Sequence, residues 1–152
     1  MARLFPLQPL FDLAQNRVDE AARKLGQLKT IWHNAEEKLR QLQAYREDYR
    51  AKLHETVQGG MGATQMRDFH LFLEKLETAI RHQTKEVERC QLKWDEGQLE
   101  WLEQRRKLKT YDTLSQRHQK LEQKREAKID QRDQDEYARK AFDRKNTSNE
   151  KE

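Results

Sequence analysis

Apolar residues recur every three to four positions through the first part of the chain. Alternate steps of four and three residues from Ala14 reach eleven apolar side chains and one arginine: Ala14, Val18, Ala21, Leu25, Leu28, Trp32, Ala35, Leu39, Leu42, Arg46, Tyr49 and Leu53. A mean spacing of 3.5 residues is the heptad repeat of a left-handed coiled coil. The segment therefore predicts a long helix with a narrow apolar seam.

A glycine cluster interrupts the repeat after Gln58, at Gly59, Gly60 and Gly62. Glycine is favoured just past a helix end, and Thr64 is expected to cap a second helix. The same stepping then resumes: Met66, Phe69, Leu73, Leu76, Ile80, Gln83, Val87, Cys90, Trp94, Gly97, Trp101, Gln104, Leu108 and Tyr111. Gly97 is expected to leave room for a bulky seam residue of the first helix, such as a tryptophan.

Two long helices joined by a short loop are antiparallel neighbours. We therefore predict an all-α fold, an antiparallel coiled-coil hairpin forming one domain over residues 1–145. The first helix is expected at about 10–58, the loop at 59–63 and the second helix at about 64–144, with a disordered polar tail at 146–152. The second helix should extend well past the start of the first, and such a segment is normally held by a partner.

The composition favours an elongated protein over a compact one. Charged residues make up 38% of the chain and apolar residues 34%, which is too little apolar surface for an ordinary globular core. The net charge is only +4, and balanced charge with regular apolar spacing favours helix over disorder.

Motifs of enzymes and metal sites are missing from the sequence. It has no phosphate-binding glycine loop, its five histidines are scattered, and its single cysteine, Cys90, falls on the seam as a small core residue. We expect no catalytic residue, no cofactor and no bound metal. One cysteine, no secretory signal and no apolar run of about 20 residues predict a soluble intracellular protein.

The charge distribution argues against nucleic-acid binding. Residues 1–58 hold 10 Lys and Arg against 8 Asp and Glu, and the remainder holds 21 against 19. Neither part is strongly basic, and the densest basic run, Arg105 to Lys109, is short. A specific nucleic-acid interface is therefore disfavoured.

Aromatic residues also occur beside the seam, close to the loop. Folding at the glycines brings two rows to the same level: Leu42, Tyr45 and Tyr49 on the first helix, and Phe72, Leu76 and Ala79 on the second. A two-helix hairpin cannot cover a second apolar stripe, so we interpret these six residues as a partner-binding patch. The alternative is that Tyr45 and Phe72 only lean across the edge of the seam.

Several segments resemble the family of the flagellar export protein FliJ. They are LFDLA (10–14), VDEAARKLG (18–26), AEEKLRQL (35–42), YREDYR (45–50), FLEKLETAI (72–80), the Trp101 region through Leu114, and IDQRDQDEYAR (129–139). None is a catalytic signature, but their order around the glycine loop is fairly specific.

The resemblance implies a non-catalytic stalk similar to that of rotary ATPases. Such a stalk would bind and stimulate the hexameric flagellar export ATPase, contact the membrane export gate and the export chaperones, and work at the cytoplasmic face of the bacterial inner membrane. The resemblance assigns the gate contact to the six-residue partner-binding patch. The helix ends remote from the loop would enter the ATPase ring, including Asp133, Asp135, Glu136, Tyr137, Arg139 and Arg144.

Other classes of function remain open. The chain could be the equivalent stalk of a virulence type III secretion system, or a structural or adaptor coiled coil unrelated to export. The adaptor would form a stable dimer rather than bind an ATPase.

Overall fold

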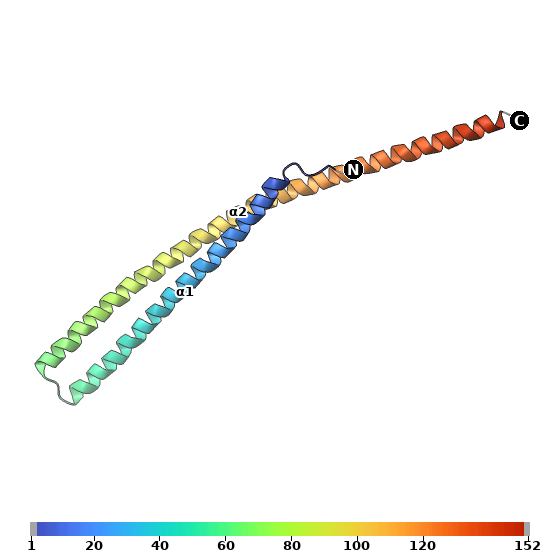
Figure 1. Cartoon of the computed structure of the whole chain (residues 1–152). Coiled ribbons are helices and arrows are strands. Elements are labelled where there is room, and N and C mark those ends of the chain that lie inside the picture. Colours follow the sequence, from blue (N-terminus) through green and yellow to red (C-terminus); the bar gives the residue numbers. More distant parts are fainter. Residues whose placement is uncertain (1–2, 151–152) are drawn as a thin grey trace. The chain divides into compact units, whose positions relative to one another are not determined.

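Two helices account for nearly all of the computed structural model, which describes residues 3–150. Helix α1 spans Gln8–Gln58 and helix α2 spans Ala63–Asn149, joined by a short loop (Figure 1). No strand occurs between residues 3 and 150. The predicted all-α fold with two long packed helices is confirmed.

Contacts divide the chain into two units, and we describe each by itself. The hairpin unit comprises Val18–Gln104 and contains the loop. The terminal unit comprises Met1–Arg17 with Arg105–Glu152, of which residues 3–17 and 105–150 are described.

Residues 59–62 connect the two helices and include three glycines. The amide of Gly59 donates to the Glu55 carbonyl at 3.2 Å, and Gly60, with a φ of 88°, donates to the Val57 carbonyl at 3.2 Å. A positive φ of this size is strained for any residue with a Cβ, so glycine is required at position 60. The Gly62 carbonyl accepts from the Met66 amide at 3.0 Å. Gly62 therefore caps α2, which begins at Ala63, and Thr64 lies within the first turn instead of capping it.

The seam of the hairpin unit follows the heptad positions. Five of the apolar positions in this unit are buried, namely Ala21, Ala35, Leu76, Ile80 and Cys90, and most of the others are half-buried. Only one side of each helix meets its neighbour, so the core is a single thin stripe.

Polar seam residues have partners across the hairpin. Gln83 is buried, and its side-chain Nε2 donates to the carbonyl oxygen of Ala35 at 2.9 Å. Arg46 is half-buried and reaches Glu77, with 3.4 Å between Nη1 and Oε2. These bonds satisfy groups that would be costly to bury alone.

The seam glycine of α2 leaves room for a bulky side chain of α1, and that side chain is a leucine instead of a tryptophan. A Cβ built on Gly97 would lie 2.8 Å from Cδ1 of Leu28. The tryptophan of α1 lies further along the seam, where the Trp32 and Trp94 ring centroids are 5.4 Å apart. The indole nitrogen of Trp32 is buried, and within residues 3–150 it has no hydrogen-bond partner.

In the terminal unit, the residues before α1 are hydrogen-bonded to α2. The backbone amide of Arg3 donates to Oε2 of Glu122 at 3.1 Å, and Nε2 of His118 donates to the Arg3 carbonyl at 2.8 Å. The rings of Phe5 and His118 lie 5.6 Å apart. Residues 3–7 therefore form a strap across one turn of α2.

Beyond Glu122, every residue of α2 as far as Asn149 is exposed. The helix continues past the expected end near residue 144. Disorder of the tail at 146–152 stays a prediction, and residues 1, 2, 151 and 152 lie outside the described part of the chain. Within residues 3–150, neither helix contains an apolar stretch of the length that a membrane crossing needs.

Candidate partner-binding surfaces

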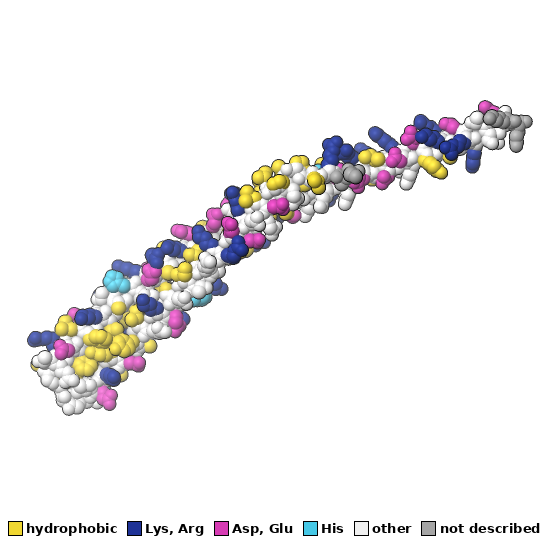
Figure 2. Space-filling model, viewed as in Figure 1, with side chains coloured by type: hydrophobic (Ala, Val, Ile, Leu, Met, Phe, Trp, Pro, Cys, Tyr) yellow, Lys and Arg dark blue, Asp and Glu magenta, His cyan; other side chains and the backbone are white. Residues whose placement is uncertain are grey.

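Aromatic side chains from both helices meet close to the loop. The Tyr49 and Phe72 ring centroids are 4.5 Å apart, and Tyr45 lies edge-on to Phe72 at 6.0 Å. Tyr49 also contacts Phe69 at 5.1 Å. We call Tyr45, Tyr49, Phe69 and Phe72 the aromatic patch. Figure 2 shows hydrophobic side chains gathered near the loop end on the face in view.

The six residues of the predicted binding site differ in how much of their surface is exposed. Leu76 is only 7% exposed and belongs to the core, whereas Tyr45 is 51% exposed. The other four, Leu42, Tyr49, Phe72 and Ala79, are half-buried. Tyr49 and Phe72 do pack over the edge of the seam, so Tyr45 offers the largest accessible surface. Binding of a partner by these residues stays a prediction.

The sequence reasoning overlooked Phe69 as a member of the patch. Phe69 is a seam position three residues before Phe72, and residues at that spacing are neighbours on a helix. The spacing alone could have identified it.

The environment of Tyr49 is apolar enough to affect its hydroxyl. Burial raises the pKa of Tyr49, and the nearby Tyr45 and Asp68 contribute in the same direction. The raised pKa favours the neutral phenol, which is able to donate a hydrogen bond.

The opposite edge of the hairpin is charged at the same level. Arg50 Nη2 lies 2.9 Å from Oε1 of Glu77, which also pairs with Arg46. In the heptad repeat, Arg50 and Glu77 occupy the edge across the seam from Tyr45 and Phe72. The hairpin thus has one aromatic and one ionic edge near the loop, so a partner could distinguish the two.

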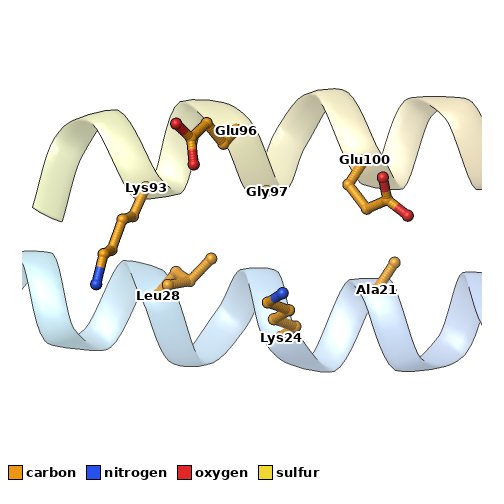
Figure 3. Close-up of a pocket in the computed structure, with 7 residues that line it drawn as sticks. All are labelled: Ala21, Lys24, Leu28, Lys93, Glu96, Gly97 and Glu100. Carbon is orange, nitrogen blue, oxygen red and sulfur yellow. The ribbon is translucent and has the colours of Figure 1, made fainter.

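A groove of about 520 Å³ opens beside Gly97. Figure 3 shows its walls, in which Lys93 reaches towards α1 and Ala21 points from α1 towards Glu100. Two lysines, Lys24 and Lys93, and two glutamates, Glu96 and Glu100, line it, so the groove carries no strong net charge. It is lined by no serine, cysteine or histidine, and no cluster of three metal-binding side chains occurs within residues 3–150.

Cys90 has the properties of a core residue. It is buried, and its Sγ lies 3.7 Å from Oε1 of Glu86. Burial is the main cause that raises the pKa of this thiol, so it stays protonated and weakly reactive. The seam interpretation of Cys90 agrees with this environment.

The residues predicted to enter an ATPase ring are all exposed on the last part of α2: Asp133, Asp135, Glu136, Tyr137, Arg139 and Arg144. They do not share one face. Helical spacing places Asp133, Tyr137 and Arg144 on one side and Asp135 with Arg139 on another. Gln131 Nε2 donates to Oδ1 of Asp135 at 3.1 Å. Charges of both signs line this segment in Figure 2.

Comparisons with known proteins agree on one family. The family model described as "Flagellar FliJ protein" matches residues 3–147. A flagellar FliJ protein from Salmonella typhi is 32% identical over 145 residues, covering 95% of this chain and 99% of that relative. Its counterpart from Escherichia coli (strain K12) is 31% identical over 145 residues, with the same coverage.

Proposed function

The chain belongs to the family of flagellar FliJ proteins, and on that premise we propose that it is a stalk of the flagellar type III protein export apparatus. In this role it binds and stimulates the hexameric export ATPase. It also links that ATPase to the membrane export gate and to export chaperones. It acts without catalysis of its own and lies at the cytoplasmic face of the inner membrane as a peripheral component.

The observation that supports this proposal most directly is the uncovered end of α2. Residues 123–149 form 27 consecutive exposed helical positions, which span about 40 Å at 1.5 Å per residue. A single helix of this length with mixed charges is weakly stable alone and gains order from a partner. Its narrow cross-section suits the central pore of a ring.

Charges spread around the helix suit contact with several subunits. Because Asp133 and Asp135 lie on different sides of α2, a surrounding ring would meet different side chains at different subunits. A subunit conformation that binds the helix more tightly is favoured over the others by the difference in binding free energy, so unequal contacts bias different subunits differently. Stimulation of the ATPase then needs no nucleotide site in this chain.

The aromatic patch supplies the proposed contact with the gate. Tyr45 is accessible and is backed by the packed rings of Tyr49 and Phe72. Aromatic groups on a rigid support are frequent anchors of protein interfaces. The ionic edge formed by Arg50 and Glu77 would leave only one apolar edge of the hairpin for docking.

An ATPase assay with and without the purified chain tests the proposal. We expect higher ATP hydrolysis and co-assembly with the hexamer. A triple variant, Tyr137→Ala, Arg139→Glu and Arg144→Glu, should lose most of the stimulation, and Tyr45→Ala should retain it. For binding to the gate, Tyr45→Ala should lose most of the affinity, and the triple variant should retain it. If the wild-type chain neither stimulates ATP hydrolysis nor co-assembles with the hexamer, the stalk role is refuted.

A further inference from the structure

Two polar side chains interrupt the apolar seam of the hairpin and bond across it. Arg46 is the single position of the α1 repeat that is not apolar, and its Nη1 lies 3.4 Å from Oε2 of Glu77. Gln83 is a buried position of the α2 repeat, and its Nε2 donates to the Ala35 carbonyl at 2.9 Å. We call the Arg46–Glu77 contact the ionic pin, the Gln83–Ala35 contact the amide pin, and both together the seam pins.

The ionic pin is reinforced by a second arginine of α1. Arg50 Nη2 lies 2.9 Å from Oε1 of Glu77, so both oxygens of this carboxylate face arginines across the hairpin. The side chains of Arg46 and Glu77 are 23% and 32% exposed, and partly buried pairs are screened less than open ones. A partly buried charge without its partner is costly. A displacement that separates these groups is therefore disfavoured.

The loop leaves the stagger, which is the position of α1 along α2, to other contacts. Gly59 and Gly60 donate to carbonyls of α1, and the Gly62 carbonyl accepts from Met66 of α2. None of these loop hydrogen bonds joins one helix to the other. Three glycines also make the connection adaptable.

Apolar seam layers alone would accept more than one stagger. Successive layers are about 5 Å apart, from 3.5 residues per layer and a rise of 1.5 Å per residue. A slide by one layer sets apolar side chains against apolar side chains again. The same slide separates Arg46 from Glu77 and Gln83 from the Ala35 carbonyl. Polar groups at seam positions select one register in coiled coils.

The present stagger is also the one that builds the aromatic patch. Tyr49 and Phe72 come from different helices, and their ring centroids are 4.5 Å apart. Tyr45 meets Phe72 across the same seam at 6.0 Å. Arg46 directly follows Tyr45 and lies one turn before Tyr49, so the ionic pin acts at the level of the patch. A slide of about 5 Å would take Tyr49 off Phe72.

We propose that the seam pins position the gate-binding site, because they select the one stagger in which the two helices assemble the aromatic patch. The pin residues touch no partner in this role and act through the aromatic side chains. This inference rests on the proposed function of the patch. Replacing the pins by residues that form no bond across the seam should keep the hairpin folded but leave its stagger undetermined.

An unpinned variant, Arg46→Leu/Glu77→Gln/Gln83→Leu, tests the proposal in the full-length chain. Apolar seam replacements should leave helix content and thermal stability close to those of the wild type. With labelled aromatic rings, the wild-type chain should give one set of nuclear magnetic resonance signals and a nuclear Overhauser effect between Tyr49 and Phe72. The unpinned variant should give several sets, with that effect confined to one of them.

Binding to the purified gate protein should weaken by the factor that the spectra give. Because only the patch-forming stagger binds, the apparent dissociation constant rises in inverse proportion to its population. A fall of that population to about one tenth lowers the affinity about tenfold. Equal affinity of both chains, alongside several staggers in the variant, would overturn the proposal.

Two further variants separate positioning from packing. In the Gln83→Leu background, Arg46→Lys keeps a cation that reaches Glu77, so it should retain one set of signals, whereas the unpinned variant should not. Gln104→Leu is the matched control. Gln104 is also a polar seam residue of α2, but its Nε2 donates to Glu100 of the same helix at 2.8 Å. Its loss should leave one set of signals and full binding.

The proposal is overturned if the unpinned variant keeps a single set of signals, because the loop alone would then determine the stagger. It is also overturned if that variant loses helix content, because the pins would then hold the fold rather than select its stagger. Absence of gate binding by the wild-type chain would refute the proposed function of the patch, and with it the positioning role. The spectra of the two chains would still show whether the pins select the stagger.

Discussion

Leu28 fills the space that the missing side chain of Gly97 leaves in the seam. A Cβ at position 97 would lie 2.8 Å from Cδ1 of Leu28 and 3.4 Å from Cδ1 of Leu25. Gly26 lies on the exposed face of α1, and a Cβ there would meet nothing within 4 Å. The two helical glycines therefore differ in what they do for the fold.

Substituting each of these glycines by alanine should separate the effect of helix propensity on stability from the effect of side-chain packing. Gly26→Ala should raise the free energy of unfolding by about 1 kcal/mol, because alanine is the better helix former. Gly97→Ala gains the same propensity but crowds two leucines, and overpacking costs roughly 1–3 kcal/mol. Urea denaturation followed by circular dichroism should show stabilisation for Gly26→Ala only. Equal stabilisation by both variants would mean that Leu28 moves aside freely.

Gln83 offers a second test, because its side chain bonds to the Ala35 carbonyl across the seam. Gln83→Ala removes this hydrogen bond and leaves a void, and we expect a loss of about 1–3 kcal/mol. Gln83→Leu fills the space, and the change should stay within about 1 kcal/mol, since exchanging a polar seam group for an apolar one of similar size is often neutral. Thermal denaturation of the two variants provides the comparison. A leucine variant as unstable as the alanine variant would show that the bond itself dominates.

The strap at residues 3–7 should respond to pH through Glu122. The hydrogen bond from the Arg3 amide is the main cause that lowers the pKa of this carboxylate. A lowered folded pKa means that the contact stabilises the strap above the ordinary glutamate pKa and is lost as pH falls through the folded value. The Arg3 amide resonance should therefore titrate below the ordinary glutamate range in nuclear magnetic resonance spectra. Glu122→Gln should abolish that titration, and its persistence would assign the shift to another group.

The sequence was sufficient for the fold because one pattern determines most of it. Heptad spacing identified the buried positions, and Gly60 adopts the positive φ that the turn requires. The spacing could not say which seam residues face each other, because that stagger depends on the conformation of the loop. For this reason Leu28 and not a tryptophan occupies the space at Gly97.

The candidate surfaces were less predictable than the seam. Periodicity located Tyr45 beside the seam but could not show that Tyr49 and Phe72 partly cover each other. The strap depends on backbone groups of Arg3, which carry no sequence signal.

Leu76 and Tyr45 belong to one predicted binding site, but their truncation should have different effects. Loss of Leu76 should lower stability, and loss of Tyr45 should weaken binding. Leu76 is a buried seam residue, so Leu76→Ala should lower the free energy of unfolding by about 2–5 kcal/mol. Tyr45→Ala removes a half-exposed ring and should cost about 1 kcal/mol or less. If Tyr45 contacts the gate, its variant loses binding while the chain stays fully helical. Titration against the purified gate protein, beside circular dichroism of the same samples, distinguishes the cases. Binding that follows helix content in both variants would show that the patch only stabilises the hairpin.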